Sequence, residues 1–299
     1  MQTRAGGGLR AAILAAAESL AAAGIPSAET EAEQLAAHVL AVDRGRLRFL
    51  DTTAPDFDAR YRELIAARAR RIPQQHLTGT APFGPLTLHV GPGVFIPRPE
   101  TEAMFEWATT VLGLDGFSDS PLIVDLCTGS GALAVSLARH RPDAQVIAVD
   151  DDPVALRYAA QNAQGTAVRL VEADVTTADL LADLDGRVDL LVSNPPYIPD
   201  GADLEPEVAD HDPHHALFGG VDGMSVIAAI VGLAGRWLRP GGRLAIEHDD
   251  TTSAATVGLV TGTGLFRDVE PRRDLAGRPR FVTAVRTDEM APMNQKGPR

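Results

Sequence analysis

The stretch of sequence that decides the fold is VDLLVSNPPY, residues 188–197. Four of its first five residues are apolar, which predicts a buried β-strand. The strand must end at the two prolines, because a proline has no N–H for a ladder and fixes its own φ. The residue before each proline is held extended. The strand therefore ends in a stiff elbow that presents the Asn194 amide and the Tyr197 ring, at the sheet edge where open α/β folds bind ligands.

The elbow carries the groups needed to hold a planar amino group. The Asn194 Oδ1 atom and a neighbouring carbonyl are two acceptors for the two hydrogens of one –NH2 group, and the Tyr197 ring can pack on its flat face. Carboxamides and the exocyclic amines of nucleobases both have such a group. The structural alternative is a turn at Pro195-Pro196 that an asparagine caps.

Composition restricts the class of protein. The chain has 299 residues, enough for one large or two ordinary domains, and is 45% hydrophobic and 22% charged, as soluble globular proteins are. The net charge of −13 argues against a DNA-binding surface. Cys127 is the only cysteine, which excludes an intrachain disulfide and favours the reducing cytoplasm. No apolar run reaches transmembrane length, so we expect no membrane association.

The N-terminal part of the sequence is typical of a small helical domain. Helices are predicted over residues 9–23, from a Ser27 cap to about Ala41 with Thr30 and Glu31 in the first turn, and over 56–71 with Tyr61, Leu64 and Ile65 buried. The third helix is basic, through Arg60, Arg62, Arg68, Arg70 and Arg71. These arginines form either a solvated helix face or a docking surface for an acidic or RNA-bearing partner.

Residues 73–99 are rich in Gly and Pro around two short β-like runs, Leu86–Val90 and Val94–Ile96, and predict a hairpin and connector. A helix is expected again at about Glu100–Leu112. The predicted segments are a helical substrate-docking domain (1–72), the β-hairpin and connector (73–99), a catalytic domain (100–286) and a disordered tail (287–299).

From residue 121 the pattern alternates between strand and helix, which predicts a mostly parallel α/β sheet covered on both faces. The predicted strands are Leu122–Leu126, Gln145–Val149, Ala167–Val171, Val188–Val192 and Arg243–Glu247. The predicted helices are Gly131–Arg139, Pro153–Gln164, Met224–Leu238 and Thr251–Gly262. Phe266–Glu270 and Arg280–Arg286 follow without a helix between them and predict an antiparallel pair. A parallel sheet closed by such a hairpin is the Rossmann-like architecture of class I methyltransferases.

A glycine-rich loop follows the first of these strands. Asp125-Leu-Cys-Thr-Gly-Ser-Gly131 opens a helix, and its glycines let a ligand approach the backbone amides. Asp150 ends the next strand, 19 residues after Gly131, where a carboxylate can bind both ribose hydroxyls. The loop also fits the G-x-G-x-x-A fingerprint of dinucleotide sites. Asp125 argues against NAD as the ligand, because adenosylmethionine enzymes have an acidic residue at this position before the loop. Asp174 can accept from an adenine amino group, with Val175 against the base; alternatively, Asp174 caps its own turn.

Six motifs together resemble the HemK/PrmC family, the release factor glutamine N5-methyltransferases, over about residues 10–286. They are Arg71-Ile-Pro-Gln-Gln-His-Leu-Thr-Gly79, Phe95-Ile-Pro-Arg-Pro-Glu-Thr-Glu102, the 125–131 loop, Asn194–Tyr197, Arg239-Pro-Gly-Gly242 and Asp274-Leu-Ala-Gly-Arg278. The resemblance implies S-adenosylmethionine as methyl donor, S-adenosylhomocysteine as product and no metal. It implies that the substrate is the glutamine in the Gly-Gly-Gln loop of class I release factors. We expect the enzyme to be monomeric and cytoplasmic and to bind no DNA directly.

The resemblance also implies the site residues. The cofactor would be bound by Asp125, Cys127, Thr128, Gly129, Ser130, Gly131, Asp150, Asp174, Val175 and Asn194. The glutamine would be held by Asn194, Pro195, Pro196 and Tyr197, with Asn194, Pro195 and Tyr197 acting in catalysis. Two alternatives share the elbow motif: a nucleic-acid amino-group (adenine N6-type) methyltransferase and a ribosomal-protein glutamine methyltransferase. A non-catalytic adenosylmethionine-binding adaptor is a third.

Two positions depart from the family pattern, which has glycine in place of Cys127 and Glu-Ile-Gly in place of Glu247-His248-Asp249. A backbone φ above zero at Cys127 would strain a non-glycine residue. No base lies near Cys127 in any motif, so a nucleophilic role is not expected. The spacing of Asp210, His211, Asp212, His214 and His215 matches no standard zinc pattern. A loop that covers the active site is expected there instead.

Overall fold

The computed structural model describes residues 8–50, 56–114 and 116–288. These residues form two compact units. The helical unit comprises the described residues up to Thr80 together with Leu204–His211. The sheet unit comprises residues 81–203 and the described residues from Asp212 onward. From residue 289 onward, the predicted tail lies outside the described residues.

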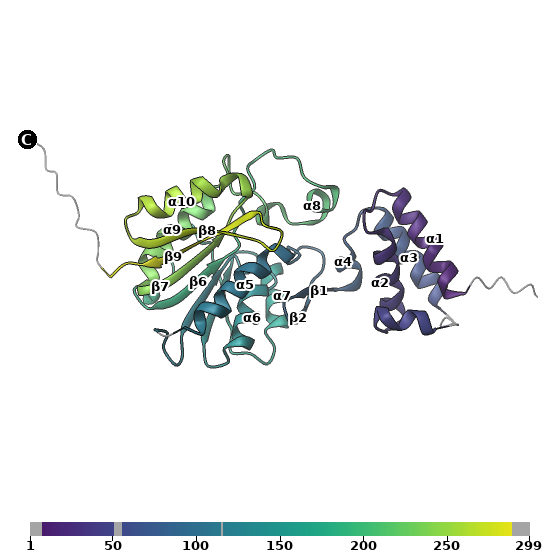
Figure 1. Cartoon of the computed structure of the whole chain (residues 1–299), viewed down its shortest axis with the longest axis horizontal. Coiled ribbons are helices and arrows are strands. Elements are labelled where there is room, and N and C mark those ends of the chain that lie inside the picture. The colour runs from purple at the N-terminus through teal and green to yellow at the C-terminus, as the bar shows by residue number, and fades with distance from the viewer. Residues whose placement is uncertain (1–7, 51–55, 115, 289–299) are drawn as a thin grey trace, which may run out of the picture. The chain divides into compact units, whose positions relative to one another are not determined.

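The helical unit contains the three predicted helices and several short ones (Figure 1). Its elements are α1 (Leu9–Ala22), α2 (Ala28–Leu40), the 3-10 helix η1 (Arg44–Phe49), α3 (Phe57–Ala69), α4 (Gln74–Thr78) and α8 (Pro206–His211). The core includes Leu20 and Leu35, which are fully buried, and the stacked rings of Phe57 and Tyr61, whose centroids are 4.9 Å apart. As predicted for α3, Tyr61 and Ile65 are buried and Leu64 partly so. The short helices α4 and α8 were not predicted.

The position of the predicted cap at Ser27 is confirmed, but the expected capping hydrogen bond is absent. Ser27 occupies the N-cap position of α2, but its hydroxyl makes no capping bond to a backbone amide. It donates instead to Glu31 Oε1 at 2.8 Å. The reason is that Glu31 belongs to a polar network, and the hydroxyl helps to hold this carboxylate.

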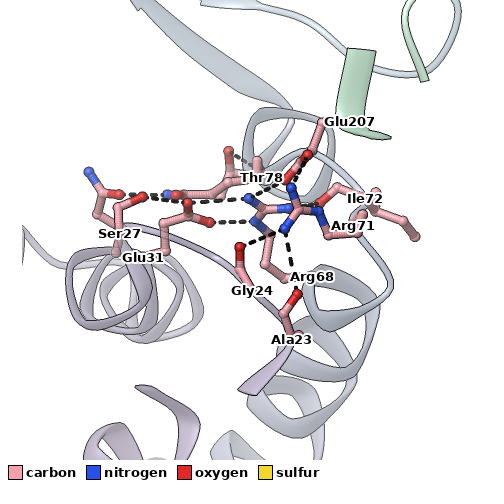
Figure 2. A network of polar contacts seen from close by, with 11 residues as sticks. Ala23, Gly24, Ser27, Glu31, Arg68, Arg71, Ile72, Thr78 and Glu207 are labelled. Carbon is pink, nitrogen blue, oxygen red and sulfur yellow. Dashed lines mark hydrogen bonds and ion pairs between the residues drawn. The ribbon is translucent and has the colours of Figure 1, made fainter. Parts of the chain in front are cut away.

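One arginine of the predicted basic face is in fact buried. Arg68 is only 5% exposed and bridges two carboxylates (Figure 2): its Nε donates to Glu31, and its Nη2 lies 3.0 Å from Glu207 Oε1. The other oxygen of Glu207 accepts from Arg71 Nη2 at 2.6 Å. Glu207 lies on α8, so the basic side of α3 receives a segment from 139 residues further along the chain. Arg60, Arg62 and Arg70 remain exposed.

The sheet unit is built on a seven-stranded sheet with the order β5-β4-β3-β6-β7-β9-β8. Its strands are β3 (Leu122–Leu126), β4 (Gln145–Asp150), β5 (Arg169–Glu172), β6 (Val188–Ser193), β7 (Leu238–Glu247), β8 (Phe266–Arg273) and β9 (Pro279–Arg286). The first five pair in parallel, and β9 is antiparallel to both β7 and β8. The predicted parallel sheet with a terminal antiparallel hairpin is therefore confirmed.

Helices cover both faces of this sheet (Figure 1). The helices are α5 (Pro99–Leu112), α6 (Ala132–His140), α7 (Pro153–Asn162), α9 (Ser225–Trp237) and α10 (Ser253–Gly262). Successive residues of a strand point to opposite faces. Ile123 and Leu190 accordingly pack with α5 and α6, whereas Val124 and Leu191 pack with Trp237 and its neighbours on α9. Burial on both faces explains why the central strands are apolar without alternation.

The hairpin predicted in residues 73–99 exists, but one of its strands was assigned wrongly. It pairs β1 (Thr80–Phe83) with β2 (Leu86–His89), and Val94–Ile96 is not a strand. Val94 and Ile96 are nevertheless buried, in a small cluster with Ala81 and Val90. Their apolar pattern reflects packing of an extended connector rather than strand pairing.

Candidate active site

A cavity opens at the carboxyl ends of the parallel strands. The order of the strands reverses between β3 and β6, and such a switch point is where open α/β sheets form a binding crevice. The cavity measures about 1180 Å³ including its open mouth and lies within the sheet unit. Its wall includes nearly all of the predicted site residues: Asp125, Cys127, Thr128, Gly129, Ser130, Asp150, Asp174, Val175, Asn194, Pro195, Pro196 and Tyr197.

Gly131 is the predicted site residue that does not line the cavity. It has φ +84°, and an added Cβ would come within 3.2 Å of Val135 and 3.3 Å of Ala159. This glycine therefore allows the loop to turn and lets α6 pack closely against α7, rather than contacting a ligand.

Asp125 lines the cavity and has one unsatisfied carboxylate oxygen. Its Oδ2 accepts from Thr128 Oγ1 at 2.6 Å and from the Ala134 amide at 3.0 Å. Among the described residues, its Oδ1 is buried and has no hydrogen-bond partner. Burial raises the pKa of Asp125 to about 7 despite these two donors. A bound cation or ammonium group would satisfy this oxygen and favour the ionised form.

Asp150 holds the glycine-rich loop in place. Its Oδ2 accepts from the Gly129 amide at 2.8 Å and its Oδ1 from the Asp152 amide at 3.0 Å. Burial raises the pKa of Asp150, although both amide bonds oppose the shift. Each carboxylate oxygen has a second lone pair, so Asp150 retains the capacity to accept from a ligand's hydroxyl groups.

Asp174 caps its own turn, which was one of the two roles considered for it from the sequence. Its Oδ1 accepts from both the amide and the hydroxyl of Thr176, each at 2.7 Å, and these bonds lower its pKa. Asp174 and Val175 nevertheless both line the cavity. Capping fixes this carboxylate at the cavity wall, so the two roles are compatible.

Cys127 occupies the left-handed backbone region, with φ +57°. This is the conformation that favours the glycine of the family pattern and strains a residue with a Cβ. Burial and the nearby Asp150 raise the pKa of the thiol. Because a protonated thiol is a poor nucleophile, a nucleophilic role for Cys127 is still not expected.

Three hydrogen bonds hold the elbow and the residues on either side of it to β3, to α5 and to the loop that contains Leu217. Ser193 Oγ donates to the Leu126 carbonyl at 2.7 Å, which ties β6 to β3. Asn194 Nδ2 donates to Thr101 Oγ1 at 3.1 Å. After the elbow, the Ile198 amide donates to the Leu217 carbonyl at 2.9 Å. The elbow is thus fixed on both sides, and the Asn194 amide has a defined orientation.

Sequence reasoning missed two residues at this site, Thr101 and Glu247. Thr101 Oγ1 donates to Glu247 Oε2 at 2.8 Å, and the Tyr197 hydroxyl donates to Glu247 Oε1 at 3.0 Å. Burial raises the pKa of Glu247 to about 7, and it also raises the pKa of Tyr197, which stays a donor. Both residues lie within motifs of the sequence, residues 95–102 and 247–249, but nothing in the spacing indicated that they meet.

The histidine-rich segment forms no metal site in the described part of the chain, where no group of three or more potential ligands comes together. Asp212 is buried and pairs with Arg98, and His215 Nε2 lies 3.4 Å from Asp152 Oδ2. Pro213, His215 and Leu217 line the cavity. Within the described ranges, no helix has both the length and the apolar content needed to cross a membrane.

Comparison with known proteins identifies both units. The methyltransferase small domain family matches residues 91–211, and the PrmC N-terminal domain family matches residues 11–79. The release factor glutamine methyltransferase of Mycobacterium tuberculosis is 62% identical over 293 residues, which are 97% of this chain and 95% of that protein. The protein of the same description from Mycolicibacterium smegmatis is 64% identical over 278 residues, which are 93% and 98% of the two chains.

The similarity to solved structures concerns the fold and not the function. A methyltransferase from Pyrococcus furiosus has a TM-score of 0.48 at 16% identity, covering 67% of this chain and 88% of its own. The relatives from Mycobacterium tuberculosis, Mycolicibacterium smegmatis and Mycobacterium leprae are similar over nearly their whole length at 60–64% identity. The chain therefore belongs to the release factor glutamine methyltransferase family.

Proposed function

We propose that this protein transfers a methyl group from S-adenosylmethionine to the side-chain amide nitrogen of the glutamine in the Gly-Gly-Gln loop of class I release factors. The relatives' shared description supports the substrate. The observation that supports the chemistry most is the orientation of Asn194 at the cavity. Its amide nitrogen donates to Thr101, which leaves its Oδ1 to accept from a substrate –NH2 group.

The cavity fits the cofactor by the chemistry of its donors. S-adenosylmethionine supplies a methyl group on a positively charged sulfonium sulfur. The unpartnered Asp125 Oδ1 suits the ammonium of the methionine end, and Asp150 retains acceptor capacity for the ribose hydroxyls. We assign the base to Asp174 and Val175 and the remaining contacts to the loop from Cys127 to Ser130.

The substrate amide needs positioning rather than a strong base. Its nitrogen is a poor nucleophile because the lone pair is delocalised into the carbonyl, and exact placement can supply roughly 7–11 kcal/mol of the barrier. Asn194 Oδ1 and the Pro195 carbonyl accept the two amide hydrogens, and the Tyr197 ring packs on the amide plane. These two acceptors also stabilise the positive charge that develops on nitrogen. The proton leaves to water after the transfer.

Transfer of labelled methyl from S-adenosylmethionine to a purified class I release factor tests this proposal. A release factor with its Gly-Gly-Gln glutamine changed to alanine and an unmodified duplex DNA serve as controls. We expect label on the intact factor alone. Label on the DNA would favour a nucleic-acid amino-group methyltransferase, and equal label on both release factors would refute the assigned glutamine.

A further inference from the structure

A chain of hydrogen bonds runs from the elbow into the interior of the sheet unit. It starts at Asn194 Nδ2, passes through Thr101 Oγ1 at 3.1 Å to Glu247 Oε2 at 2.8 Å, and ends at the Tyr197 hydroxyl, 3.0 Å from Glu247 Oε1. Thr101 is 4% exposed and Glu247 is 1% exposed. The chain joins α5, the end of β7 and the elbow, three segments that are distant in sequence.

The direction of each hydrogen bond follows from the number of hydrogens available. A threonine hydroxyl has one hydrogen, and that of Thr101 goes to the Glu247 carboxylate. Toward Asn194, Thr101 can therefore only accept. The atom of Asn194 that meets it must be the –NH2 nitrogen, which turns Oδ1 to the opposite side of the amide.

The same carboxylate also fixes the second substrate-facing side chain. The ionised carboxylate of Glu247 accepts only, so the Tyr197 hydroxyl must donate to it. This bond holds the far end of a ring that belongs to a residue of the cavity wall. Glu247 thus orients Asn194 through Thr101 and orients Tyr197 directly, although it lies behind the groups that touch the substrate.

We propose that Thr101 and Glu247 are positioning residues for methyl transfer, which set the acceptor atom of Asn194 and the ring of Tyr197 before the substrate binds. This inference rests on the proposed function, since it assumes that an amide is the group held at the elbow. If the chain were only structural, its loss would lower the stability of the fold and the affinity for both substrates. A positioning role predicts that turnover falls instead.

The charged groups around Glu247 act in opposite senses on its ionisation. Arg280, from β9, attracts the carboxylate and favours its ionised form, whereas Glu100, from α5, opposes it. Burial is the largest influence and favours the protonated form. The hydroxyls of Thr101 and Tyr197 are the groups that hydrogen-bond to it directly.

Two substitutions at Thr101 separate positioning from packing. Thr101→Val keeps the shape and removes the hydroxyl, whereas Thr101→Ser keeps the hydroxyl and removes a methyl group. Thr110→Val removes an exposed hydroxyl from the same helix and is the matched control. Turnover of a release factor is measured at saturating cofactor, with the cofactor dissociation constant measured by calorimetry and the melting temperature measured alongside.

We expect Thr101→Val to lower kcat roughly 10- to 100-fold, the scale at which small misplacements act, while the cofactor dissociation constant stays within about threefold. Thr101→Ser should recover most of the lost turnover. Equal kcat for Thr101→Val, Thr110→Val and the wild type would overturn the inference, as would a loss that the serine does not recover. Failure of the wild type itself to label the glutamine would instead refute the proposed function, so the two failures are distinguishable.

Discussion

Each of the two units contains a glutamate that bridges two side chains. The two bridges have opposite effects on the pKa of the bridging carboxyl group. Glu207, on α8 of the helical unit, binds the guanidinium groups of Arg68 and Arg71. Glu247, at the end of β7 in the sheet unit, binds the hydroxyls of Thr101 and Tyr197. The first bridge neutralises charge. The second supplies hydrogen-bond donors but no charge.

The two bridges accordingly shift the carboxyl pKa in opposite directions. Burial alone would raise the pKa of Glu207, but hydrogen bonds from its backbone and the two arginines lower it below its ordinary value. Burial raises the pKa of Glu247 to about 7, and its hydroxyl donors do not compensate. A charge-paired glutamate is suited to holding two segments together at any physiological pH. A hydroxyl-paired glutamate changes the direction of its hydrogen bonds near neutrality.

The largest expected loss of stability follows removal of Arg68, the arginine that pairs with both Glu31 and Glu207. Arg68→Met leaves Glu31 with an uncompensated buried charge, and breaking such a pair costs about 3–5 kcal/mol. Hydrogen exchange of the α2 and α3 amides measures this loss without requiring the whole chain to unfold in one step. Arg70→Met, at the exposed C-cap position of α3, is the control. Equal protection in the two variants would show that the bridge contributes little.

Replacing each glutamate with glutamine tests whether Glu247 and Glu207 differ in their effect on turnover. Gln keeps one acceptor and gains two donors, so at position 247 one of the two hydroxyls faces a donor instead of an acceptor. Glu247→Gln should lower kcat roughly 100-fold for a short peptide that contains Gly-Gly-Gln. Glu207→Gln should leave it within about threefold. Similar losses in both variants would contradict a specific role for Glu247.

The raised pKa of Glu247 predicts that turnover depends on pH in a range where Glu207 does not titrate. The ionised fraction of a carboxyl with pKa about 7 rises about tenfold between pH 6 and pH 8. Once protonated, Glu247 becomes a donor and can reverse the bond to Thr101. At saturating cofactor, which removes the contribution of Asp125 to cofactor binding, kcat should rise about tenfold over this range. Glu247→Gln should abolish the rise, and an unchanged slope would disprove the assignment.

Stability should change in the opposite sense over the same range. A folded-state pKa above the unfolded value gives stability that is present below the unfolded pKa of about 4.3 and is lost as pH rises through about 7. For Glu247 the full loss is on the order of 4 kcal/mol, and about 2 kcal/mol of it falls between pH 5.5 and pH 8. For Glu207 the lowered pKa gives stability that is lost only as pH falls below that range. Urea unfolding of the wild type and of Glu247→Gln at pH 5.5 and pH 8 measures the difference.

The smallest expected effect lies at Cys127, where backbone strain rather than charge is involved. Glycine at φ +57° avoids the strain of a Cβ, so Cys127→Gly should be about 1 kcal/mol more stable than Cys127→Ala. Thermal unfolding of the two variants measures this directly. A more stable alanine variant would mean that the loop accommodates a side chain without strain.

Local patterns in the sequence predicted the fold well, because strand and helix periods are local properties. Prediction failed where a distant segment decided the structure. Arg68 has the sequence setting of a solvated arginine, and only the arrival of Glu207 from α8 explains its burial. Thr80–Phe83 pairs with β2 although Val94–Ile96 has the more strand-like sequence.

The candidate site divides in the same way. The predicted site residues that line the cavity lie at or just after the ends of β3, β4, β5 and β6, so the order of motifs along the chain was enough to predict them. Thr101 and Glu247 are 146 positions apart and meet only when α5 packs against the sheet beside β7. Burial and hydrogen-bond partners, which define their role, are properties of the folded chain.

The central claim is that Asn194 holds the substrate amide, and the most direct test measures Asn194→Ala in two assays. Turnover of a release factor should fall by at least roughly 100-fold, because the amide loses an acceptor that aligns it with the methyl group. The dissociation constant for S-adenosylmethionine should change much less. Unchanged turnover would contradict the account, and an equal loss of cofactor affinity would assign Asn194 to cofactor binding instead.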